Sequence, residues 1–136
     1  CRGGKRDMSE KALTMKLMEG LYGVCRLNRD EAIPEWVFQG SFYSVTKTLN
    51  ELSVVCSQDN IPDKIKCEKD WRILRVEGPL DFSLIGILSS ISTTLANKGI
   101  SIFVISTYDT DYIFVKDKKV DMAIDALSAE KYEIIR

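Results

Sequence analysis

The chain has 136 residues, a length that fits one domain or two small units. Its 19 basic and 20 acidic residues leave a net charge of −1, whereas nucleic-acid binding usually needs a basic excess that neutralises phosphates. There is no histidine, so the usual general base and the commonest transition-metal ligand are missing. The composition argues against nucleic-acid binding and against histidine-based catalysis or metal binding, and we expect no cofactor.

Residues 1–11 are expected to form a flexible tail, and they contain no apolar segment of the kind that a secretory signal requires. No apolar run approaches the roughly 20 residues needed to cross a bilayer. Cys25 and Cys56 lie in apolar, strand-like runs and are interpreted as small buried side chains in a reducing compartment, with a redox role as the alternative. We therefore expect a cytoplasmic protein that binds no membrane.

Residues 12–69 predict a strand-rich unit with almost no helix. Leu13, Met15 and Leu17 alternate with polar residues, which indicates a half-buried strand. Two later runs rich in β-branched and aromatic residues predict a hairpin. The expected elements are strands over 12–18, 22–27, 42–48, 52–57 and 65–68, with a short helical turn over 33–36.

Residues 70–136 predict the order β-α-β-β-α-β. Asp81 or Ser83 is expected to cap the first helix, and Gly99 to end it. Apolar residues at helical spacing mark the two helices: Leu84, Leu88, Ile91 and Leu95 in the first, and Val120, Ala123, Ile124 and Leu127 in the second. The expected strands cover 71–77, 101–107, 112–116 and 132–135. This order favours an α+β, ferredoxin-like unit: a four-stranded antiparallel sheet with both helices on one face.

Two segments resemble the ACT domain family, VEGPLDFSLIGIL at residues 76–88 and GISIFVISTYDTDY at residues 99–112. The resemblance is greatest to the branch related to aspartate kinase regulatory domains and to the cytosolic arginine sensors of animals. It implies tandem ACT units, a degenerate one over 12–69 and a complete one over 70–136. It further implies a non-catalytic protein that binds an amino-acid-type ligand, pairs as a homodimer and has a regulated enzyme as a further candidate partner.

The loop between the first strand and helix of the second unit is one half of a candidate ligand site. A helix N-terminus carries unsatisfied N–H groups and a partial positive charge, which suit a carboxylate, and Gly78 allows close approach to the backbone. The alternative is a simple turn in which Asp81 caps its own helix. Arg26 and Arg75 lie within strands and are interpreted as solvated sheet residues, with anion binding as the alternative.

The turn between the two central strands is the other half. Asp109 and Asp111 are ordinary turn residues, but a carboxylate here is also suited to an ammonium or guanidinium group, and the resemblance to arginine sensors favours Asp111. Together the two halves would recognise a zwitterion. The candidate ligand-binding residues are Gly78, Leu80, Asp81, Phe82 and Ser83 on one side, and Ser106, Thr107 and Asp111 on the other.

A structural protein that uses the fold only to pair with itself or with a partner remains the alternative, because exposed sheet edges invite pairing. An acylphosphatase-like enzyme would need a basic residue in its phosphate loop, and residues 78–83 contain none. The aromatic RNA-binding strand pattern is also absent from the sequence.

Overall fold

The computed structural model describes residues 13–77 and 86–136 and divides the chain into two compact units. The C-terminal unit joins Cys1–Met18 to Arg72–Arg136, and the N-terminal unit is Glu19–Trp71. The strand expected over 12–18 is present as β1, Thr14–Leu17, but it belongs to the C-terminal unit instead of the unit over 12–69 to which the sequence assigned it. The tail expected over 1–11 lies outside the described residues.

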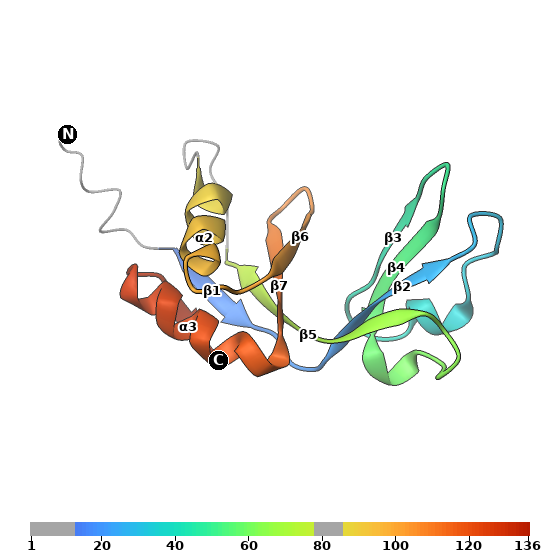
Figure 1. The fold of residues 1–136 in the computed structure, drawn as a ribbon, viewed down its shortest axis with the longest axis horizontal. Coiled ribbons are helices and arrows are strands. Elements are labelled where there is room, and N and C mark those ends of the chain that lie inside the picture. Colours follow the sequence, from blue (N-terminus) through green and yellow to red (C-terminus); the bar gives the residue numbers. More distant parts are fainter. Residues whose placement is uncertain (1–12, 78–85) are drawn as a thin grey trace. The chain divides into compact units, whose positions relative to one another are not determined.

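The sheet of the C-terminal unit has the strand order β8-β1-β5-β7-β6. Figure 1 labels the strands β1, β5, β7 and β6. The other strands of this sheet are β5 (Cys67–Val76), β6 (Ile102–Ser106), β7 (Asp111–Lys116) and β8 (Glu133–Ile135). β1 pairs antiparallel with β5, where Met15 faces Val76, and parallel with β8, where Met15 faces Ile134. The expected four-stranded antiparallel sheet was therefore wrong, because β1 adds a fifth strand and makes the sheet mixed.

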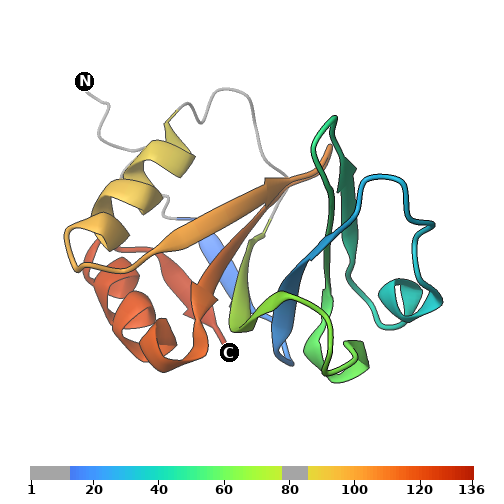
Figure 2. The ribbon, with the colours of Figure 1, turned by 45° about the vertical axis from the view of Figure 1, so that its right-hand side comes forward.

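Two helices, α2 (Ile87–Ala96) and α3 (Val120–Ala129), lie on the same side of these strands (Figure 2). The predicted apolar stripes are confirmed where they are described. The buried positions are Ile91 and Leu95 in α2, and Val120, Ala123, Ile124, Ala126 and Leu127 in α3. Helix α2 begins after Gly86, which has a φ of 87°, and the expected caps Asp81 and Ser83 lie outside the described residues. Within residues 13–77 and 86–136, no helix has the length and apolarity needed to cross a membrane.

The core of the C-terminal unit forms where the strand and helix periodicities meet. Leu74 and Val76 on β5, and Ile113 and Val115 on β7, recur in steps of two and pack with the helices in one buried cluster. Beside β7, a turn of 3-10 helix over Asp117–Lys119 leads into α3.

The N-terminal unit is an antiparallel sheet in the order β3-β4-β2-β5. Its elements are β2 (Tyr22–Leu27), β3 (Ser44–Lys47), β4 (Leu52–Ser57) and two short 3-10 turns at Glu35–Phe38 and Gln58–Asn60. The predicted hairpin is confirmed as β3–β4. The strands expected separately at 65–68 and 71–77 are one strand, β5. The core gathers Cys25, Leu27, Val37, Val54 and Cys56.

Candidate functional site

The turn between β6 and β7 is closed by two threonines. The Thr107 N–H donates to the carbonyl of Thr110 at 2.8 Å, and the Thr110 N–H donates back to Thr107 Oγ1 at 3.3 Å. Tyr108 and Asp109, at the tip, are exposed. The turn is therefore held by Thr107 and Thr110, and the Asp109 side chain is exposed to solvent.

Ser106 and Asp111 face each other where the hairpin opens into its strands. The Ser106 hydroxyl donates to Asp111 Oδ1 at 2.5 Å, and Asp111 is half-buried. An ionised carboxylate offers about four acceptor positions, and this bond uses one. The structure thus brings together the three predicted residues Ser106, Thr107 and Asp111, with carboxylate capacity left for a cationic group.

Thr110 joins this hairpin to the end of β5. Its side chain is buried, with 7% of the residue exposed, and its hydroxyl donates to the carbonyl of Val76 at 2.5 Å. The chain enters the second half of the predicted site immediately after Glu77. The five residues of that half, Gly78, Leu80, Asp81, Phe82 and Ser83, lie outside the described residues.

Arg75 on β5 forms an ion pair with Glu77, the residue that follows the strand. Arg75 Nε donates to Glu77 Oε2 at 2.7 Å, and the two side chains are about a third exposed, at 35% and 31%. The hydrogen bond to Glu77 raises the pKa of Arg75, and the proximity of Tyr112 raises it further. The arginine that the sequence presented as a solvated residue or an anion clamp therefore has a carboxylate partner. Sequence reasoning missed Glu77 and Thr110, which lie beside the candidate site. For Glu77 the available signal was its spacing of two residues from Arg75, which places both side chains on one face of an extended chain.

Three thiols form a separate cluster in the N-terminal unit. Cys25 and Cys67 face each other across β2 and β5. Cys25 and Cys56 are fully buried, which confirms the sequence prediction for these two side chains. A hydrogen bond with Cys56, followed by burial, raises the pKa of Cys25, and burial raises the pKa of Cys67 to about 12. The same hydrogen bond with Cys25 lowers the pKa of Cys56. Since the thiolate is the reactive species, the raised pKa values of Cys25 and Cys67 favour a core role for these two thiols.

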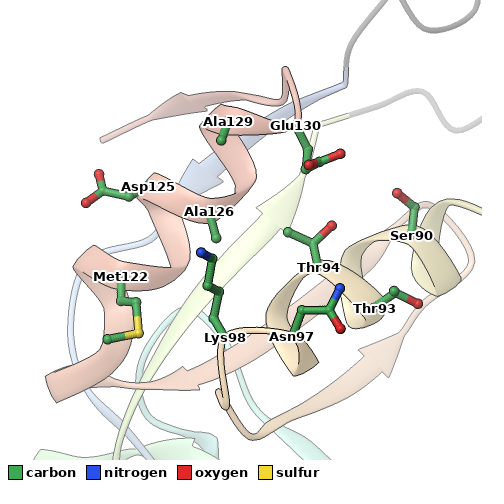
Figure 3. A pocket seen from close by; sticks show the side chains of 10 residues that line it. All are labelled: Ser90, Thr93, Thr94, Asn97, Lys98, Met122, Asp125, Ala126, Ala129 and Glu130. Atoms are coloured by element: carbon green, nitrogen blue, oxygen red, sulfur yellow. The ribbon is translucent and has the colours of Figure 1, made fainter.

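A cavity of about 740 Å³ lies between α2 and α3 (Figure 3). Small and polar side chains line it: Ser90, Thr93, Thr94, Asn97 and Lys98 with Met122, Asp125, Ala126, Ala129 and Glu130. The three predicted site residues that the structure describes, Ser106, Thr107 and Asp111, are not among them. Across the part of the chain that the structure describes, no group of three His, Cys, Asp or Glu side chains could hold a metal ion.

Comparison with known proteins places this geometry in context. The ACT domain family model matches residues 66–129, and a model for an N-terminal domain matches residues 20–64. A solved protein from Agobacterium tumefaciens is 35% identical over 91% of this chain and 92% of its own, with a TM-score of 0.87.

Two more distant structures share the fold. One is a Vibrio cholerae protein of unknown function, described as a possible transport protein, at 22% identity, 94% and 98% coverage and a TM-score of 0.76. The other is the ligand-free regulatory subunit of Thermus thermophilus aspartate kinase, at 13% identity, 84% and 93% coverage and a TM-score of 0.58. The α+β, ferredoxin-like fold expected from the sequence, with tandem units of which the first has little helix, is confirmed.

Proposed function

The chain belongs to the ACT domain family, and on that premise we propose that it is a non-catalytic regulatory module that binds a free amino acid. The ligand lies at the β6–β7 hairpin and the loop that follows β5. The observation that carries the proposal is the fastening of the hairpin to the end of β5 by Thr110. This bond supports a single site made from two segments more than 20 residues apart in sequence.

Asp111 is the recognition residue for the ammonium group. Its carboxylate is oriented by Ser106 and is half-buried, so that a charge-assisted hydrogen bond there is stronger than one in open water. The N–H groups of the loop over 78–83 receive the carboxylate of the ligand, and Gly78, Leu80, Asp81, Phe82 and Ser83 form that side. Because Arg75 is already paired with Glu77, the N–H groups of the loop are the proposed donors to the ligand carboxylate.

We further propose that the protein is a cytoplasmic homodimer and that it regulates an enzyme. Strand β6 supports the pairing, because Ile102, Phe103, Val104 and Ile105 are half-exposed and carry no charge. In the described part of the chain, β6 pairs with β7 on one side and with no strand on the other, so it forms an edge of the sheet. An uncharged apolar edge invites another strand. This same feature favours the second candidate function, a pairing scaffold that binds no small molecule.

A thermal-shift screen of the purified chain against the twenty amino acids tests the proposal. A ligand at about 100 times its dissociation constant stabilises the folded state by roughly 2.7 kcal/mol, which raises the melting temperature by several degrees. We expect one clear stabilising amino acid, whose effect is lost in Asp111→Ala.

The matched control is Asp109→Ala, which removes an exposed carboxylate two residues away. It will keep the stabilisation if recognition depends on the geometry of Asp111 and not on the charge of the hairpin. Equal binding by wild type and Asp111→Ala would refute the site. A flat screen in folded protein would instead favour the pairing scaffold.

A further inference from the structure

The N-terminal unit contains a cavity of about 410 Å³ with a concentrated positive charge. Its lining residues are Arg26, Leu27, Asn28, Arg29, Glu31, Asn50, Lys64, Ile65 and Lys66. Four of these are cationic and one is a carboxylate, although the whole chain has a net charge of −1. The excess of positive charge is therefore local to this cavity.

Backbone pairing brings two of the cationic residues together. Cys25 faces Cys67, and beside this pair the Arg26 N–H donates to the carbonyl of Lys66, the residue before β5, at 3.1 Å. Side chains opposite each other on one face of a sheet lie close, and like charges there are destabilising. An anion bound between them would remove this repulsion.

Backbone carbonyls hold the two guanidinium groups without neutralising them. Arg26 Nη2 donates to the carbonyl of Asn50 at 3.0 Å, and Arg29 Nη1 donates to that of Leu49 at 3.3 Å. Their carboxylate contacts are longer, at 3.9 Å from Arg26 to Glu51 and 3.6 Å from Arg29 to Asp30. The guanidinium groups are thus positioned in advance, which lowers the cost of ordering them around a ligand.

The two lysines supply charge that the protein itself does not use. Among residues 13–77 and 86–136, the ammonium groups of Lys64 and Lys66 make no hydrogen bond or ion pair, and both residues are exposed. The one carboxylate in the lining, Glu31, accepts the Asn28 N–H at 2.7 Å. The cavity therefore combines fixed guanidinium groups with free ammonium groups.

We propose that this cavity binds a small phosphorylated molecule. Arginine matches phosphate oxygens with paired donors, and lysine adds a compact charge. The volume falls within the roughly 300–1,000 Å³ of small-molecule sites. Asp30, Glu31 and Glu51 surround the cations and would repel an extended polyanion, so a compact ligand fits better than a nucleic acid or a membrane surface. The site is independent of the amino-acid site at Asp111.

The test is isothermal titration calorimetry of the full chain with inorganic pyrophosphate at low and at physiological ionic strength. We expect saturable binding that weakens with salt. Lys64→Gln and Lys66→Gln will each weaken binding by about tenfold, the equivalent of losing one charge-assisted hydrogen bond. Neither ammonium group has a partner in the described chain, and the backbone bond of Lys66 does not depend on its side chain, so both variants are expected to fold. Lys118→Gln, at an exposed lysine of the C-terminal unit, is the matched control and will bind as the wild type does.

Parallel titrations with inorganic phosphate and ADP identify the source of the phosphate. Tighter binding of ADP than of pyrophosphate would support a nucleotide, and equal binding would support recognition of the phosphate group alone. Asp111→Ala is expected to bind pyrophosphate normally, which keeps this result separate from that of the amino-acid screen. Absence of pyrophosphate binding by folded protein at low salt, or equal losses in all three lysine variants, would overturn the proposal.

Discussion

Replacing Thr110 by valine tests the connection between the hairpin and β5. Valine keeps the shape of threonine but removes the hydroxyl that donates to the Val76 carbonyl. Thr110 is only 7% exposed, so water has little access to replace the lost donor. Leaving a buried acceptor without its partner costs about 1–3 kcal/mol, and that range is the expected loss in the free energy of unfolding.

Thermal unfolding followed by circular dichroism measures this loss. One kcal/mol shifts the melting temperature by about 2–8 °C in domains of roughly 60–250 residues, so we expect a decrease of several degrees. Thr110→Ser, which retains the hydroxyl, is the matched control and should lose less. Affinity for the amino acid should also fall in Thr110→Val, even though Asp111 is intact. If the melting temperature and the affinity both stayed at their wild-type values, the Thr110–Val76 bond would have no part in forming the site.

Two further predictions concern the N-terminal unit. Gly23→Ala is expected to lower the free energy of unfolding by about 1–3 kcal/mol, because the new Cβ would lie 2.6 Å from Ile61 Cδ1 and 2.7 Å from Cys67 Sγ. Urea unfolding should show a smaller loss of stability from Gly23→Ala when Ile61→Val is also present, because valine lacks the Cδ1 atom. An equal loss in both backgrounds would contradict the clash with Ile61. Burial raises the pKa of Cys67 from 9.0 to about 12, so this thiol loses its proton at a lower pH in the unfolded chain than in the folded one. The folded state is therefore favoured fully below about pH 9, and this contribution to stability is lost as the pH rises toward 12. Urea midpoints should fall less steeply with pH in Cys67→Ala, and parallel slopes would argue against the shift.

Local periodicity was enough to identify the helices of the C-terminal unit and their buried faces. Ile91 and Leu95 are one helical turn apart, as are Val120 and Ala123, and these side chains are buried. The hairpin was equally visible, because a polar turn separates two apolar runs. These features depend on residues within about ten positions of one another, so they can be identified from the local sequence.

The partners of β1 could not be predicted in this way. The alternation of Leu13, Met15 and Leu17 indicates a strand with one buried face, but it contains nothing about which strands lie beside it. Thr14 bonds to Glu133, 119 residues away, and strand insertion over such a separation is a property of the completed sheet. Assigning β1 to the nearer half of the chain followed sequence proximity, which is a weak guide to strand pairing.

The division of β5 into two expected strands has a specific cause. Asp70 adopts a φ of 70°, and its N–H donates to Gln58 Oε1 at 2.6 Å. The left-handed residue interrupts the alternation of side chains, and the register with β2 shifts between Tyr22 and Val24. An interrupted pattern resembles the end of a strand, although the strand continues through it. The side-chain bond that stabilises the irregular residue comes from another segment, so the sequence gives no sign of it.

The two proposed sites differ in charge, and this difference makes them separable in one experiment. In the proposals, Asp111 would recognise the ammonium group of an amino acid, most of which have no net charge, whereas the pocket of Arg26, Arg29, Lys64 and Lys66 would recognise a multiply charged anion. Screening by salt acts most strongly on exposed charges, and the Debye length falls from about 30 Å at 0.01 M to about 8 Å at 0.15 M. Amino-acid affinity should therefore change little over this range while pyrophosphate affinity falls. Equal salt dependence of both ligands would mean that they share one electrostatic site.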